Sequence, residues 1–134
     1  MKKVDFIKRL SQKLTDINIY SSSFERSNGD VFMFIQTDAS LLIHFSGTSG
    51  RIQVDIIRES TWDNSDDLFD YLKTKYHDMD KSPLNIKLEL DDDNNCKATV
   101  TTSLAGTIEP KSKYYIYDTF IDRICEYVRE ELKN

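Results

Sequence analysis

Residues 61–76, Thr-Trp-Asp-Asn-Ser-Asp-Asp-Leu-Phe-Asp-Tyr-Leu-Lys-Thr-Lys-Tyr, separate two groups of predicted β-strands and have the pattern of a helix. Asn64 or Ser65 can cap such a helix, and the aspartates that follow suit the positive end of its dipole. Four apolar side chains at helical spacing predict its buried face: Leu68, Phe69, Leu72 and Tyr76. We therefore expect a central helix here, with the other elements arranged around it.

The residues before this segment predict one helix and four strands. Apolar side chains recur three and four positions apart over residues 3–15, which is typical of an amphipathic helix. Strands are predicted over 17–25, 31–35, 41–45 and 52–57, separated by turn-forming residues at 27–30, 37–40 and 47–50. Short turns between successive strands favour a four-stranded antiparallel meander, in which the apolar run 31–35 is a central strand.

The residues after the segment predict a hairpin and a last helix. Apolar and polar residues alternate over 84–90 and again over 96–102, on either side of a polar turn. Residues 103–111 are expected to form an irregular connection, and Ser112 to cap a helix with an apolar stripe reaching Leu132. The sequence therefore predicts one α+β domain over 1–134. It consists of an antiparallel sheet of about six strands, a meander plus a hairpin, with three helices in the order α-β-β-β-β-α-β-β-α.

Charge is distributed unevenly along the chain, whose formal net charge is −5. Residues 1–14 hold five bases and one acid, whereas residues 55–95 hold twelve acids and five bases. An acidic middle argues against a nucleic-acid partner, because such partners require a basic surface. It fits a basic protein partner, and it equally fits a solvated surface that keeps the chain soluble.

The sequence predicts a cytoplasmic protein without a membrane segment. Its longest apolar run, 31–35, is too short to span a bilayer. Lys2 and Lys3 are followed by Asp5, Lys8 and Arg9, which interrupt any signal-peptide core.

No catalytic, cofactor-binding or metal-binding motif is present, and we expect no catalytic residues, cofactor or metal. Cys96 and Cys125 are expected to be buried free thiols, and His44 and His77 to be structural. Residues 91–95 begin like a calcium loop. They are expected to form a polar turn instead, because Cys96 stands in the position of the required glycine.

Two groups of residues are candidates for contact with a partner. The first is the acidic group in the central segment: Trp62, Asp63, Asp66, Asp67 and Asp70. The second is a tyrosine cluster at the start of the last helix, Tyr114, Tyr115 and Tyr117, because tyrosine is enriched at interface hot spots. Covering a sheet edge is the alternative role for these tyrosines.

Three stretches carry a resemblance to a known family: residues 29–34, Gly-Asp-Val-Phe-Met-Phe, residues 67–72, Asp-Leu-Phe-Asp-Tyr-Leu, and the hairpin between Leu84 and Val100. In their pattern and order the chain resembles the YezG-like immunity proteins, which partner secreted nuclease toxins of bacteria. The same element order is similar to that of type III secretion chaperones and their YbjN-like relatives, which bind extended protein segments.

Both resemblances imply protein binding without catalysis. The immunity interpretation implies that the acidic region occupies the basic cleft of a nuclease-type toxin domain. The chaperone interpretation implies a homodimer that binds a protein segment. A small enzyme of unknown type is the third alternative.

Overall fold

The computed structural model describes residues 3–47, 51–76, 84–90, 95–107 and 114–133. The predicted fold class and element order are confirmed: three helices and a six-stranded antiparallel sheet follow one another as α-β-β-β-β-α-β-β-α. The elements are α1 (Lys3–Asp16), β1 (Ser21–Glu25), β2 (Val31–Ile35), β3 (Asp38–Ser46), β4 (Arg51–Trp62), α2 (Ser65–Lys75), β5 (Leu84–Leu90), β6 (Cys96–Thr107) and α3 (Tyr114–Leu132).

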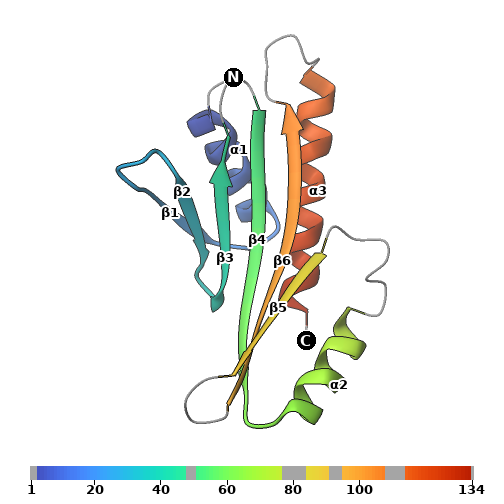
Figure 1. Ribbon diagram of the computed structural model, residues 1–134. Coiled ribbons are helices and arrows are strands. Elements are labelled where there is room, and N and C mark those ends of the chain that lie inside the picture. The colour runs from blue at the N-terminus through green and yellow to red at the C-terminus, as the bar shows by residue number, and fades with distance from the viewer. Residues whose placement is uncertain (1–2, 48–50, 77–83, 91–94, 108–113, 134) are drawn as a thin grey trace.

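The strands lie in the order β1-β2-β3-β4-β6-β5, so the predicted meander is joined to the predicted hairpin through β4 and β6. These two long strands pair over their whole length, from Arg51 opposite Thr107 to Trp62 opposite Cys96. Figure 1 shows them as the spine of the molecule, with β1–β3 on one side and β5 and α2 at one end.

The main core lies between one face of the sheet and the helices α1 and α3 (Figure 1). Strand residues that point toward the helices alternate with residues that point away, as the twofold periodicity of a strand requires. The fully buried large side chains come from both layers: Phe6, Leu10 and Leu14 of α1, Met33 and Ile35 of β2, Leu41, Ile43 and Phe45 of β3, Ile52 and Ile56 of β4, and Ile121 and Ile124 of α3. None of the helices in the described part of the chain has the length and apolar character of a membrane span.

A second, smaller core joins α2 to β6. Leu68, Leu72 and Tyr76 pack there against Cys96, Ala98 and Val100, and Trp62 and Tyr71 border them. The helix of residues 61–76 is therefore peripheral, and the expectation that it is central is wrong. The main core forms without it.

Three predicted boundaries or faces are corrected. The strand predicted over 17–25 begins only at Ser21, because Asn18 has a left-handed φ of 64° and the chain turns after α1. In the connection predicted over 103–111, residues 103–107 instead belong to β6, and residues 108–111 lie outside the described residues. Phe69, predicted to be buried, is 46% exposed.

The helix predicted over 61–76 also begins later than expected. Thr61 and Trp62 belong to β4, and α2 begins at Ser65. The turn at 37–40 is shorter than predicted, since β3 begins at Asp38. Four predicted features lie outside the described residues: residues 91–94 of the polar turn predicted over 91–95, the cap at Ser112, His77 and the side chains of the tyrosine cluster.

Candidate functional site

The four predicted contact aspartates lie on the surface at the start of α2. Asp63, Asp66, Asp67 and Asp70 are all exposed. Asn64 caps the helix: its Oδ1 accepts a hydrogen bond of 2.9 Å from the Asp67 amide, and its Nδ2 donates one of 3.0 Å to the Asp67 carboxylate. Helix capping and the helix dipole thus account for acidic residues in this first turn, whether or not a partner binds them.

Trp62, the fifth predicted contact residue, packs inward from the end of β4. Its ring lies 4.9 Å from that of Tyr71, and its Nε1 donates a hydrogen bond of 3.0 Å to Ser60 Oγ. The side chain is half-buried in the second core. Packing against α2 therefore explains this tryptophan, and the structure does not bring its ring into one exposed surface with the aspartates.

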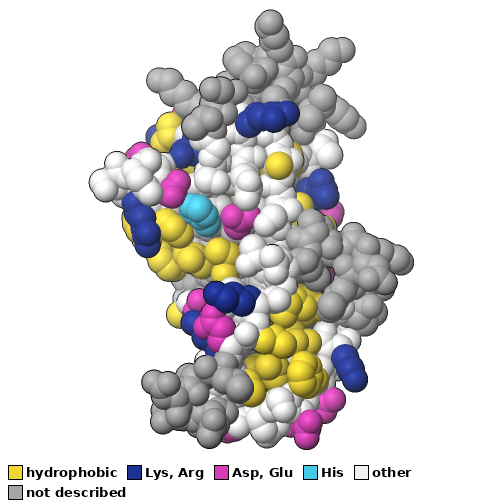
Figure 2. Space-filling view, in the orientation of Figure 1, with side chains coloured by type: hydrophobic (Ala, Val, Ile, Leu, Met, Phe, Trp, Pro, Cys, Tyr) yellow, Lys and Arg dark blue, Asp and Glu magenta, His cyan; other side chains and the backbone are white. Residues whose placement is uncertain are grey.

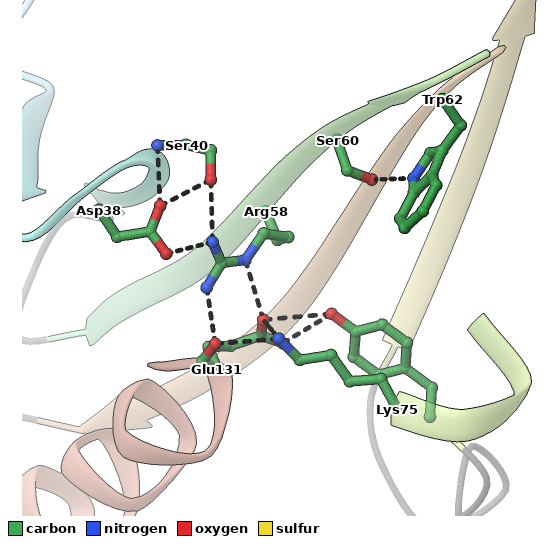
Figure 3. A network of polar contacts seen from close by, with 8 residues as sticks. Asp38, Ser40, Arg58, Ser60, Trp62, Lys75 and Glu131 are labelled. Atoms are coloured by element: carbon green, nitrogen blue, oxygen red, sulfur yellow. Dashed lines mark hydrogen bonds and ion pairs between the residues drawn. The ribbon is translucent and has the colours of Figure 1, made fainter. Parts of the chain in front are cut away.

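A buried polar network joins β3, β4, α2 and α3 where the two cores meet (Figure 3). Its centre is Arg58, which is 8% exposed. Arg58 Nε donates to Glu131 Oε2 at 3.2 Å, Nη2 donates to the Glu131 carbonyl oxygen at 2.6 Å, and Nη1 bonds both Asp38 and, at 2.8 Å, Ser40 Oγ. The guanidinium therefore holds the end of α3 against β3 and β4.

Glu131, also 8% exposed, is the acidic centre of the same network. Tyr76 donates to its carboxylate at 2.9 and 3.1 Å, and Lys75 donates to its carbonyl oxygen at 2.9 Å. These bonds fasten the C-terminal end of α2 to α3. The buried Arg58 and Glu131 are joined by the half-buried Asp38 and Lys75, so two acids face two bases and the charges of the network balance.

The network shifts the pKa values of Asp38 and Arg58 in directions that keep both charged, and that of Tyr76 in the direction that keeps it neutral. Burial opposes the charge on Asp38, but hydrogen bonds from Ser40 and Arg58 outweigh it and hold the pKa of that carboxyl below its usual value. Burial likewise opposes the charge on Arg58, and its bonds to Asp38 and Glu131 raise its pKa. Burial and then the charge of Glu131 raise the pKa of the Tyr76 phenol, so it stays a hydrogen-bond donor.

An open depression of about 620 Å³ lies over this network, and Asp70 lines its rim with Tyr71, Thr74 and Lys133. Its buried floor is Arg58 and Glu131, whose polar atoms bond within the protein. Within the described residues no group of three His, Cys, Asp or Glu side chains is arranged to hold a metal ion. The depression is therefore the outer side of a structural ion network.

A different surface, which the sequence did not predict, lies on the sheet face that α1 and α3 leave uncovered. We call Phe24, Phe32 and Phe34 the aromatic patch. Phe24 stacks on Phe32 at 5.6 Å and on Phe34 at 5.4 Å between ring centroids, and Phe24 and Phe34 are 45% and 38% exposed. Figure 2 shows apolar side chains gathered on this face beside the histidine.

Polar groups border the aromatic patch on two sides. The guanidinium of Arg26 lies 4.5 Å from the centre of the Phe32 ring. The His44 ring also stacks on the Phe32 ring, with 4.6 Å between the ring centroids. His44 lies between two carboxylates, 3.5 Å from Asp30 and 3.8 Å from Asp55. His44 thus packs against the patch, in line with the structural role expected for it.

The sequence contains one signal for this patch. Residues 31–35 are apolar at every position, which predicts a strand covered on both faces. In the structure Met33 and Ile35 face the helices, whereas Phe32 and Phe34 face away from them. A fully apolar strand with one uncovered face is what produces the exposed rings.

Comparisons with known proteins give a structural likeness and show no family. No protein-family model and no curated protein matches the chain. Among solved structures, the chain is similar to YbjN from E. coli, with 16% identity and a TM-score of 0.47 over 97% of this chain and 87% of YbjN. This likeness assigns no function to the chain, and the predicted membership of the YezG-like immunity proteins stays a prediction.

Proposed function

We propose that the chain is a non-enzymatic module that binds another protein, and that the aromatic patch is its contact surface. The supporting observation is the exposure of two stacked phenylalanines, Phe24 and Phe34, on an uncovered sheet face. Contiguous exposed apolar groups on a soluble protein mark interaction surfaces, and large aromatic rings supply much of the energy at protein interfaces.

The strand that carries Phe32 and Phe34 is anchored in the main core, which favours binding. The opposite face of β2 is locked into the main core through Met33 and Ile35, which are 0% and 2% exposed. Rings held by a packed strand lose little conformational freedom when a partner covers them, so less of the binding energy is spent on ordering.

The protein's buried polar groups support a role without catalysis. Arg58 and Glu131 line the depression of about 620 Å³, but they bond each other, and Tyr76 donates to the Glu131 carboxylate. Burial, followed by the charge of Asp122, raises the pKa of the Cys125 thiol to about 11, so this cysteine is a poor nucleophile at neutral pH.

The test compares three phenylalanines of similar exposure. Phe24→Ser and Phe34→Ser remove rings from the aromatic patch, and Phe69→Ser removes an equally exposed ring from α2. Each tagged variant is used to recover partners from the source cell, and the yield of each captured protein is compared with that of the wild type. We expect the patch variants to lose a partner that the Phe69 variant keeps. Loss only in the Phe69 variant would refute the patch as the contact surface.

A finer form of the proposal is that the partner is a basic, nuclease-type toxin domain that this chain neutralises as an immunity protein. It is supported by the exposure of Asp63, Asp66, Asp67 and Asp70 on one end of α2. An acidic surface steers a basic partner toward it and makes the association rate depend on salt.

Charge reversal separates this finer form from the broader proposal. Asp63→Lys combined with Asp70→Lys changes the acidic end without touching the capping pair Asn64 and Asp67. The control, Asp122→Lys combined with Glu126→Lys, makes the same change of charge on exposed positions of α3. The binding partner in this assay is a basic toxin domain encoded beside the gene. At low salt the first variant should associate with it at least tenfold more slowly than the wild type, and the control should associate at the wild-type rate. Equal rates would contradict the immunity role and leave the aromatic patch untouched.

A further inference from the structure

The strand β1 forms one edge of the sheet. It is short, with five residues, and Glu25 is its one charged residue. It consists of Ser21-Ser22-Ser23-Phe24-Glu25, and its last four residues are exposed. Its pairing with β2 is regular over all five residues. Lysine, proline and bulges, which commonly protect edge strands from pairing, are absent from it.

Hydrogen bonds at both ends of the β1–β2 pair show which backbone groups point outward. The Arg26 amide donates to the Asp30 carbonyl at 2.8 Å, and the Gln36 amide donates to the Tyr20 carbonyl at 2.9 Å. In an antiparallel pair, hydrogen-bonded and non-hydrogen-bonded positions alternate. The even-numbered residues of β1 therefore bond β2, and Ser21, Ser23 and Glu25 direct their N–H and C=O groups toward the open edge.

We propose that β1 pairs antiparallel with β1 of a second copy of this chain, about a twofold axis at Ser23. In this register Ser23 lies opposite Ser23 of the partner subunit, and Ser21 lies opposite Glu25 of the partner subunit. Each of these residue pairs exchanges two hydrogen bonds, so every outward N–H and C=O group of both strands finds a partner. The pairing is isologous and closes as a dimer.

The side chains are compatible with a second copy in this register. Glu25 meets a serine, so no two like charges lie directly opposite each other. Arg26 lies opposite the exposed Tyr20 of the partner subunit, so it also meets no like charge. The strand is complementary to itself in this register, and every molecule of the protein carries it. We therefore take a second copy of this chain, and not a foreign peptide, as the pairing partner.

The dimer has a consequence for the uncovered face of the sheet. Phe24 lies on that face, next to the seam, and is diagonal to Phe24 of the partner subunit. Two six-stranded sheets would join into one, and the two aromatic patches would become a single surface. The pairing itself does not depend on the proposed function, because it rests on the backbone of β1 alone.

The first test is the mass of the protein in solution, measured by light scattering or sedimentation. The wild type should have twice the 15.6 kDa mass of the chain at high concentration. Ser23→Pro removes an outward N–H that β2 does not use, and proline is tolerated on an edge strand. We expect this variant to be monomeric, with an unchanged circular dichroism spectrum, and Ser23→Ala to remain dimeric. A monomeric wild type at millimolar concentration, or a dimeric Ser23→Pro variant, would overturn the proposal.

A second test keeps the backbone intact, in case proline disturbs the strand. Ser23→Lys and Ser23→Asp each place like charges face to face across the twofold axis. Each variant alone should be monomeric at low salt, and an equimolar mixture should form a heterodimer. If the mixture stays monomeric while the wild type dimerises, Ser23 does not lie on the axis.

Amide hydrogen exchange tests the register directly. The amides of Ser21, Ser23 and Glu25 should exchange at least tenfold more slowly as the protein concentration is raised through dimerisation. Those of Ser22 and Phe24 should be protected at every concentration, because they bond β2. Protection of the odd-numbered amides only after a different protein is added would show that the edge accepts a foreign strand, and would refute the dimer.

Discussion

Replacing Arg58 by methionine should destabilise the protein strongly, because it removes the centre of the buried polar network. The guanidinium is 8% exposed and bonds Asp38, Ser40 and both a side-chain and a backbone oxygen of Glu131. Methionine fills part of the volume but leaves the buried Glu131 carboxylate with Lys75 as its remaining cation. Removing one partner of a buried ion pair typically lowers the free energy of unfolding by about 3–5 kcal/mol.

The free energy of unfolding of Arg58→Met can be measured by urea titration, using the fluorescence of the single tryptophan and circular dichroism together. At about 2.1 cal/mol/K per residue, a loss of about 3 kcal/mol lowers the melting temperature of a chain of 134 residues by roughly 10 °C. The double variant Arg58→Met/Glu131→Leu should lose less than the sum of the two single variants, by about 2 kcal/mol, because it leaves no unpaired buried charge on α3. Additive losses, or a loss below about 0.5 kcal/mol in Arg58→Met, would refute the reasoning.

Three other predictions concern single residues. The pKa of the Asp38 carboxyl is lowered in the folded state, so its ionisation stabilises the fold fully above its unfolded pKa. This contribution is lost as the pH falls below about 4. Asp38→Asn should therefore flatten the acid side of a plot of unfolding free energy against pH. Burial raises the pKa of Cys125 to about 11, so a thiol reagent at pH 7 should label it only after unfolding, and rapid labelling of the native protein would contradict its burial. A Cβ at Gly106 would lie 2.9 Å from the Phe120 ring, so Gly106→Ala should cost about 1–3 kcal/mol by overpacking, measurable by thermal melting, with wild-type stability as the contrary result.

The fold class could be predicted from the sequence because the local residue pattern of each element indicates a helix or a strand. The strand over 96–102 and the helix α3 can be recognised from the periodicity of their apolar residues alone. The short turns between successive strands from β1 through β4 favour a meander. The second half of β6 is not evident from the sequence because residues 103–107, Ser-Leu-Ala-Gly-Thr, include a glycine and lack strong alternation. Its pairing with the long strand β4 holds it extended.

The buried network left a signal in the sequence that periodicity alone could have revealed. Arg58 continues the inward series of Ile52, Val54 and Ile56, and Glu131 follows Val128 by three positions on the buried stripe of α3. Two opposite charges at core positions of different elements suggest an ion pair between them. Nothing local identifies which strand and helix meet, so the pairing itself required the structure.

The candidate contact surfaces show the same limit. Asp66 and Asp67 lie in the first turn of the helix, as predicted, since capping and the helix dipole are local effects. The aromatic patch was not predicted, because it exists only where α1 and α3 both pack on the opposite face of the sheet. The local sequence pattern of a helix does not indicate which face of the sheet the helix will cover.

The most direct test of the aromatic patch as a contact surface is photo-crosslinking in the source cell. A benzoyl-phenylalanine at position 34 replaces one aromatic ring by another at a site that is 38% exposed, and the same residue at the exposed position 122 of α3 serves as the control. We expect position 34 to form a covalent adduct with one defined protein other than this chain, and position 122 to form none with that protein. Absence of an adduct at position 34, or equal adducts at both positions, would contradict the proposed binding surface.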